Sequence, residues 1–375
     1  MRGVLWQVAL IFAISAAGWY LIGTLLDNLA VRRITTGFDF LSNRAGFDIS
    51  FKLLPFAPTD TVLDALAVGL TNTLLVASFA IVAATLLGGA LGLLTVPDNP
   101  LVRALVRVYV EINRNTPLLV QLFFWYGLIT LTFPTVRAAQ PIGPGIWITN
   151  RGVFLPTVDL GSMAGHALAF LALALALFFG AVRLSRGYRL RTGRSLPLAL
   201  PATGAALLAI AVYVLSTGGP TFALDRPQLR GFNIRGGLSI SPELTALLVG
   251  LTLYTSAFIA EIVRGSIATV TRGQWDAARS LGLRNGQTLR LVVVPQAMRT
   301  VVPPLASQYI NVAKNATLAA AIGFPDFVLV VNTVISQTNQ AIEGVLLIVF
   351  VYLAINLSVA AVLNWFNARL VLMER

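Results

Sequence analysis

Four ionisable side chains lie inside long apolar stretches, where a charge is costly and usually serves a function. They are Glu111, Arg114, Glu261 and Lys314. Because a carboxylate accepts hydrogen bonds from an ammonium group and a lysine donates them to a carboxylate, such a set could hold both ends of a zwitterion. A structural interpretation competes with this one. Glu111 and Arg114 are three residues apart, as are Glu261 and Arg264, and this spacing suits ion pairs along one helix.

The sequence has none of the patterns that would supply nucleotide hydrolysis or metal chemistry. A phosphate-binding loop needs Gly-x-x-x-x-Gly-Lys-Ser/Thr, but neither of the only two lysines, Lys52 and Lys314, follows a glycine. Cysteine is absent, the single histidine, His166, cannot form a ligand pair, and no Gly-x-Ser-x-Gly elbow occurs. We therefore predict that this chain is not an enzyme and binds no cofactor or metal.

The composition is that of a polytopic membrane protein, with 57% hydrophobic residues, 11% charged residues and a mean hydropathy of +0.80. The formal charge of +12 comes from arginines in short clusters between apolar runs, which indicates membrane topology and not nucleic-acid binding. Apolar windows long enough to cross about 30 Å of hydrocarbon predict an all-α membrane protein with about eight transmembrane helices. These windows are 5–26, 66–94, 106–133, 164–182, 198–216, 242–264, 306–337 and 344–368.

The distribution of basic residues predicts the orientation, since loops rich in Lys and Arg stay in the cytoplasm. With both termini cytoplasmic, the inner segments hold 16 basic residues and the outer segments hold 9. This arrangement places the polar segment 265–305 in the cytoplasm.

Two of the expected spans contain residues that interrupt a helix. Pro117 has no backbone donor and restricts Thr116, so the span should kink or restart there. The run 323–326, Gly-Phe-Pro-Asp, divides the span 306–337. It could create a separate gate helix over 327–340, or it could be an ordinary helix end with Asp326 as the next N-cap.

The cytoplasmic segment contains the signals of a short amphipathic helix. Thr271 and Gln274 have the spacing of a capping box, and Gly282 or the pair 285–286 can end the helix in a left-handed conformation. Asp276 lies in the first turn, where a negative charge suits the helix dipole. An exposed apolar ridge would fit a groove on a partner protein, or it would lie on lipid headgroups. The predicted ridge consists of Trp275, Ala278 and Leu281.

The motifs of this segment carry a family resemblance. The order Asp276-Ala277-Ala278, Gly282 and Pro295 resembles the EAA loop of ABC importer permeases of the type I core, with Asp in place of Glu. The segments 255–265 (TSAFIAEIVRG) and 114–121 (RNTPLLVQ) are similar to the polar amino-acid branch of that superfamily. The resemblance covers about residues 66–133 and 242–375.

This resemblance implies an ATP-driven importer in the bacterial inner membrane. Its partners would be ABC ATPase subunits that bind ATP and Mg, a second permease subunit, identical or homologous, and a periplasmic amino-acid-binding protein, all around a chain embedded in the lipid bilayer. The implied ATPase-coupling residues are Thr271, Gln274, Trp275, Asp276, Ala277, Ala278, Leu281, Gly282 and Pro295. The implied solute-path residues are Glu111, Asn115, Gln121, Ser256, Glu261 and Lys314.

Four segments follow from this interpretation. Residues 1–65 form an N-terminal transmembrane helix and a periplasmic segment, 66–133 the first part of the permease core, and 242–375 the second part with the coupling loop. Residues 134–241 are an insertion with two extra transmembrane helices, which resembles the long subtype of general and acidic or amide amino-acid importers. The rival functions are an ion-coupled secondary transporter, which would not need the cytoplasmic helix, and a channel or membrane scaffold.

Overall fold

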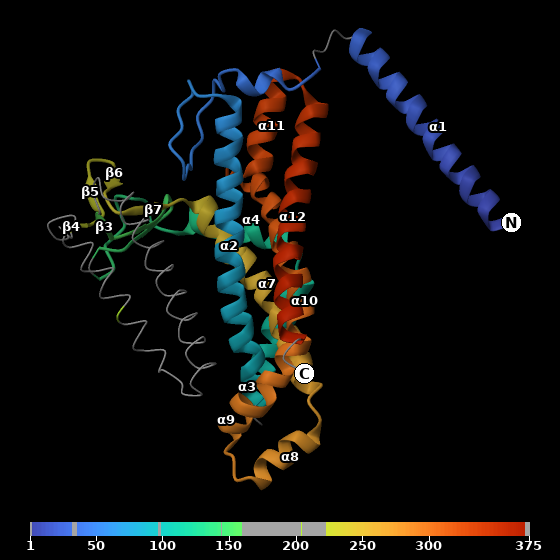
Figure 1. The fold of residues 1–375 in the computed structure, drawn as a ribbon. Helices are drawn as coiled ribbons and strands as arrows, with labels where there is room; N and C mark the ends of the chain where they lie inside the picture. Colours follow the sequence, from blue (N-terminus) through green and yellow to red (C-terminus); the bar gives the residue numbers. More distant parts are fainter. Residues whose placement is uncertain are drawn as a thin grey trace. The chain divides into compact units, whose positions relative to one another are not determined.

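A computed structural model describes residues 2–31, 36–96, 99–143, 145–159, 204 and 223–371. The chain divides into two compact units, one made of Met1–Leu131 with Ser241–Arg375 and the other of Thr132–Ile240 (Figure 1). The expected spans 164–182 and 198–216, the loop between them and His166 lie outside the described residues.

The first unit is helical in its described part. Three of its helices are long and apolar enough to cross a membrane, and a fourth crossing results if a pair of helices bent by 52° counts as one span. The eight-span count therefore stays a prediction. The elements are α1 (Arg2–Val31), a 3-10 turn η1 (Asp39–Ser42), α2 (Val62–Leu94), α3 (Pro100–Asn115), α4 (Leu118–Gly127), α7 (Pro242–Ala268), α8 (Arg272–Ser280), α9 (Asn285–Thr288), α10 (Val294–Asn315), a 3-10 segment η5 (Ala316–Ile322), α11 (Phe327–Thr338) and α12 (Ala341–Val371).

The predicted break at Pro117 is confirmed, and within the expected window 106–133 the chain restarts as a second helix. Thr116 is extended, with ψ 124°, so α3 ends at Asn115 and α4 begins at Leu118. The restriction that proline imposes on the preceding residue explains this conformation. Helix α3 also begins earlier than expected because the side chain of Asn99 accepts hydrogen bonds from the first turn.

The second break is an ordinary helix end followed by a new helix. Gly323 adopts a left-handed conformation, with φ +80°, and ends η5. The Asp326 side chain then accepts a 2.9 Å hydrogen bond from the Leu329 backbone and caps α11. The N-cap interpretation of Asp326 is confirmed.

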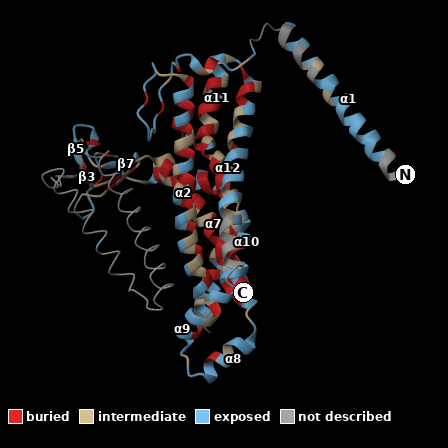
Figure 2. Cartoon of the chain, in the orientation of Figure 1, coloured by how far each residue is buried: buried red, intermediate tan, exposed pale blue. Residues whose placement is uncertain are grey.

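Helices α2 and α7 pack closely through glycines. A Cβ atom on Gly88 would lie 2.6 Å from the Ser256 backbone oxygen, and one on Gly92 would lie 2.7 Å from the Val263 Cβ atom. Because Gly88 and Gly92 are one turn apart, the two backbones approach along a shared stripe, as small residues allow in membrane helices. Figure 2 shows buried residues along α2 and α7, whereas α8 and α9 are largely exposed.

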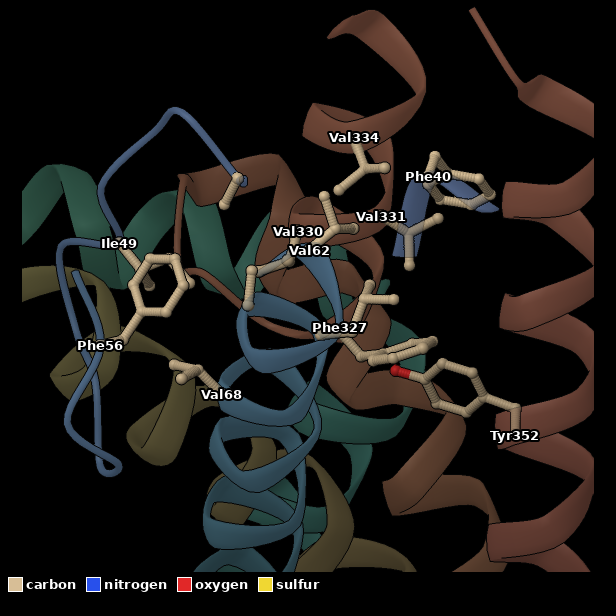
Figure 3. Packing of buried hydrophobic residues seen from close by; sticks show 13 residues of the cluster. Phe40, Ile49, Phe56, Val62, Val68, Phe327, Val330, Val331, Val334 and Tyr352 are labelled. Carbon is tan, nitrogen blue, oxygen red and sulfur yellow. The ribbon is translucent and has the colours of Figure 1, made fainter. Parts of the chain in front are cut away.

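The segment 36–61 packs on one end of α2, α11 and α12. Phe40 and Phe56 from this segment join Val68, Phe327 and Tyr352 in one buried cluster (Figure 3). Asn72 of α2 ties the same region together, because its Nδ2 atom donates to the backbone oxygens of Phe51 (2.8 Å) and Pro325 (2.9 Å). In Figure 1, α8 lies at the opposite end of this unit.

The second unit contains short strands that the sequence analysis did not predict. Their lengths of three or four residues are too short to display the alternation of a half-buried strand. A small core of Val136, Ala139, Trp147, Phe154 and Ile234 lies among them. The strands are β1 (Trp147–Thr149), β2 (Gly152–Leu155), β3 (Thr157–Asp159), β4 (Ala223–Asp225), β5 (Gln228–Arg230), β6 (Asn233–Arg235) and β7 (Leu238–Ile240), paired antiparallel as β1-β2-β7, β3-β4 and β5-β6.

Strands β3 and β4 enclose the segment 160–222. Asp159 pairs with Ala223, so the chain leaves and re-enters this strand pair at one place.

Candidate functional site

The short helix α8 forms where the sequence predicts it, but its first turn is stabilised differently. Thr271 is the N-cap residue and makes no side-chain capping bond, so the expected capping box with Gln274 is wrong. The Gln274 Oε1 atom instead accepts a 3.0 Å hydrogen bond from Gln296 Nε2 of α10. Gln274 therefore links α8 to α10, a partner 22 residues away that local spacing does not reveal.

The end of α8 is the glycine turn that the sequence predicts. Gly282 has φ +76°. Its N–H donates to the Arg279 oxygen at 2.9 Å, and the Leu283 N–H donates to the Ala278 oxygen at 3.1 Å. This pair of bonds is a Schellman motif, which satisfies the last carbonyls of the helix and turns the chain back toward α9.

The inner face of α8 differs from the predicted exposed ridge. Ala278 is 3% exposed. Trp275 is half-buried and packs on Ile267 of α7, Val293 and Ala297, so it is not a free aromatic anchor. The tryptophan turns inward because the end of α7 and the start of α10 offer it apolar surface beside the helix.

The residues that face solvent lie on the opposite side. We call Gly273, Asp276, Ala277, Ser280 and Leu281 the outer face of α8, since all five are exposed. Asp276 and Arg279 form a loose ion pair of 3.8 Å. Leu281 is 82% exposed, which leaves it as the apolar group available to a partner.

Pro295, the last residue of the predicted coupling set, is exposed in the first turn of α10. A proline there needs no intrahelical hydrogen-bond donor. A cleft of about 630 Å³ runs beside α8 and is lined in part by Thr95, Arg264, Trp275 and Arg279.

Trp275→Ala should loosen α8 from the membrane helices without unfolding them. Removing a buried tryptophan side chain costs about 3–5 kcal/mol, and a half-buried one about half of that. We expect hydrogen exchange of the α8 backbone to rise at least tenfold, measured by mass spectrometry. Gln274→Ala, which removes one exposed hydrogen bond, should raise the exchange much less. Equal exchange in the two variants would contradict the anchoring role of Trp275.

A charged cavity of about 330 Å³ lies between α3 and α7 and brings together two of the predicted solute-path residues, Glu111 and Glu261. The Glu261 carboxylate accepts from Arg264 Nε at 3.0 Å and from Arg264 Nη2 at 2.5 Å. The predicted pair one turn apart on α7 is thus confirmed as a two-pronged ion pair. The other charged residues that line the cavity are Arg103, Arg107 and Arg114.

The predicted pair Glu111–Arg114 does not form among the described residues. The Arg114 guanidinium instead lies 5.1 Å from the centre of the Phe258 ring on α7. A cation over an aromatic ring is attracted by the negative face of the ring, and this contact draws Arg114 away from its own helix.

Ser256 and Gln121 are buried and bind the protein's own chain. The Ser256 Oγ atom lies 2.7 Å from the Tyr109 hydroxyl, and the Leu253 backbone oxygen lies within hydrogen-bond distance of both hydroxyls, at 2.9 and 3.0 Å. Gln121 Nε2 donates to the backbone oxygens of Asn113 (2.9 Å) and Thr116 (3.1 Å). These contacts join α3 to α7 and support the break before α4.

Asn115 and Lys314 are exposed and do not line the cavity. The expected combination of a carboxylate with Lys314 is therefore absent from it, and guanidinium groups supply the positive charge. Arg103 and Arg107, which line the cavity with Glu111, were not predicted. The spacing of 103, 107, 111 and 114 was a usable signal, since steps of four, four and three residues return to one face of a helix.

The sequence is similar to known transport proteins along its length. The family described as "Binding-protein-dependent transport system inner membrane component" matches residues 84–372. The protein YhdX of Escherichia coli (strain K12), whose name describes an amino-acid ABC transporter permease, is 42% identical, with 100% of this chain and 95% of YhdX covered.

Two further relatives also align with the whole chain. The general L-amino acid transport system permease protein AapQ of Rhizobium johnstonii is 38% identical, with 100% of this chain and 93% of AapQ covered. The glutamate/glutamine/aspartate/asparagine transport system permease protein BztB of Rhodobacter capsulatus is 36% identical, with coverage of 100% and 95%. The similarity thus extends through residues 134–241, beyond the two segments that carry the motifs. The chain belongs to the family of binding-protein-dependent transport system inner membrane components.

Proposed function

We propose that this chain is the permease subunit of an ATP-driven importer that carries polar L-amino acids across the bacterial inner membrane, with both termini in the cytoplasm. The observation that supports this most is the form of α8: a short helix with an exposed outer face, closed by Gly282 and fixed to two longer helices. The names of the whole-chain relatives support the choice of amino acids as the solute class.

The contacts of α8 suggest how force would enter the membrane helices. A partner ATPase that binds ATP and Mg would press on the outer face of α8. Trp275 would pass the displacement to Ile267 of α7, and the bond from Gln296 to Gln274 would pass it to α10. Because α7 packs against α2 along the glycine stripe, the movement would reach both long helices together.

The cavity between α3 and α7 supports a route for a zwitterion. Glu111 and Glu261 offer acceptors for an ammonium group, and the arginines offer donors for a carboxylate. The other predicted solute-path residues do not line this cavity, and we propose that they shape or flank the route. They are Asn115, Gln121, Ser256 and Lys314. A second permease subunit and a periplasmic amino-acid-binding protein would complete the assembly.

The test is uptake by the permease reconstituted in vesicles with the ATPase and binding protein encoded beside it. We expect uptake of labelled amino acids to require ATP inside the vesicles and to continue when ionophores dissipate the proton and sodium gradients. The rival function, an ion-coupled transporter, predicts that uptake continues without ATP and stops when the gradients are dissipated. Uptake without the ATPase, driven by an ion gradient, would overturn the proposal.

A further inference from the structure

The second unit carries an exposed hairpin with an aromatic tip. Strands β5 and β6 are joined by Gly231 and Phe232, and Gly231 has φ +66°, which a two-residue hairpin turn of this kind requires. Phe232 at the tip is 69% exposed, and Leu229 beside it is also exposed. Together Phe232 and Leu229 leave apolar surface exposed on this hairpin.

Arginines surround this tip. The Arg137 guanidinium lies 4.1 Å from the centre of the Phe232 ring, and Arg151 donates a hydrogen bond to Asn233 of β6. A hollow of about 290 Å³ contains Arg137, Arg151 and Phe232 among its lining residues. The guanidinium on Phe232 holds the ring in one orientation, which reduces the entropy that binding would otherwise cost.

A second hollow of about 240 Å³ lies along the same hairpin and is lined by Arg226, Arg230 and Arg235, with Asp225 at its side. Asp225 Oδ2 accepts a 2.7 Å hydrogen bond from the Gly237 N–H, so part of its acceptor capacity is used within the unit. The described part of the unit has five exposed arginines and only two acidic residues, Asp159 and Asp225. The local surface is therefore strongly positive.

The position of these arginines in the chain runs against the topology signal. In the proposed orientation all five lie on the extracytoplasmic side, in loops short enough for the positive-inside bias to act. Topology alone would therefore favour neutral residues there. Their concentration around one aromatic tip indicates a binding role.

We propose that this Arg–Phe face, made of Arg137, Arg151, Arg226, Arg230, Phe232 and Arg235, docks an acidic patch on a folded extracytoplasmic protein, the solute-binding partner. This inference rests on the proposed function. Arginine and aromatic residues are the groups that dominate the energy of protein interfaces. Guanidinium groups pair with carboxylates through two parallel hydrogen bonds, so the hollow at Arg230 and Arg235 suits Asp or Glu side chains of a partner.

The experiment measures the concentration of the soluble binding protein that gives half-maximal ATP-driven uptake in vesicles of zwitterionic phosphatidylcholine. The variants are the double change Arg230→Glu with Arg235→Glu, and separately Phe232→Ser. Arg44→Glu is the matched control, because Arg44 is an exposed extracytoplasmic arginine of the other unit. ATP hydrolysis without binding protein reports whether each variant is folded and assembled.

We expect the double variant to raise the half-maximal concentration at least tenfold and Phe232→Ser about fivefold, which correspond to about 1.4 and 1 kcal/mol of binding free energy. Arg44→Glu should stay within twofold, and basal hydrolysis should be unchanged in all variants. Added salt should weaken the wild type more than the double variant, because screening acts on the charges that were removed.

A half-maximal concentration unchanged by both variants, or shifted equally by Arg44→Glu, would overturn the docking proposal. The docking proposal would also be overturned if phosphatidylglycerol vesicles alone reproduced the defect in uptake and protected the wild-type hairpin from chemical labelling without binding protein. In that case the Arg–Phe face would bind lipid. Failure of wild-type uptake to require ATP would instead overturn the proposed function, so the two failures are distinguishable.

Discussion

Gly88→Ala is expected to destabilise the protein severely, whereas Gly89→Ala, one residue away on the same helix, should be tolerated. The added methyl group at position 88 would lie 2.6 Å from the Ser256 backbone oxygen and 2.7 Å from the Ile259 Cβ atom. Neither is the flexible end of a side chain, so α2 and α7 would have to move apart. Overpacking of this kind costs about 1–3 kcal/mol, and more when backbone must shift.

The thermal unfolding of the purified permease in detergent measures this effect. We expect the midpoint of Gly88→Ala to fall by at least 5 °C and its yield in membranes to drop, and Gly92→Ala should behave similarly, for the same reason. A methyl group at Gly89 meets no atom within 4 Å. Equal midpoints for positions 88 and 89 would show that the α2–α7 contact is looser than the distances indicate.

Gly282→Val is expected to abolish most ATP-driven uptake while the membrane helices remain folded. At φ +76° a β-branched side chain is strained, and the left-handed conformation already costs about 1–2 kcal/mol for an unbranched residue. The Schellman bonds to Ala278 and Arg279 would be lost, and the outer face of α8 would no longer be held in one shape. We expect at least a tenfold loss of uptake in vesicles, with the unfolding midpoint changed by less than 2 °C.

Gly286→Val is the matched control, because Gly286 has no positive φ and open space around its Cβ position. Leu281→Asp tests the exposed apolar surface of α8 without changing the turn at Gly282. We expect it to remove the apolar contact with the ATPase and so to reduce co-purification of the ATPase. Normal uptake by Gly282→Val would contradict the coupling role of α8.

The helix ends and caps that single residues impose on their own backbone were predictable from the sequence. Pro117 ends α3, Gly282 closes α8 and Asp326 caps α11, because each residue restricts or stabilises its own few neighbours. The family motifs likewise located the segment that forms α8. Even its inner face followed the expected spacing of Trp275 and Ala278.

The direction of that face was not predictable. Trp275 turns inward because of surface offered by α7 and α10, and Gln274 is occupied by Gln296, so partners distant in sequence decided both. The cavity between α3 and α7 was missed for a related reason: Arg114 contacts Phe258 on another helix instead of Glu111 on its own. Spacing along one helix cannot rank a local ion pair against a contact across two helices.

The pairing of β3 with β4 brings residues 159 and 223 together in the second unit. Asp159 and Ala223 are Cα partners in an antiparallel ladder, and such partners lie about 4.5–5.5 Å apart. A two-residue turn closes that distance, so we expect the β3–β4 pair to form when such a turn replaces residues 160–222. A shortened chain of this design would retain the Arg–Phe face, and this face could be studied on a permease with two fewer predicted crossings.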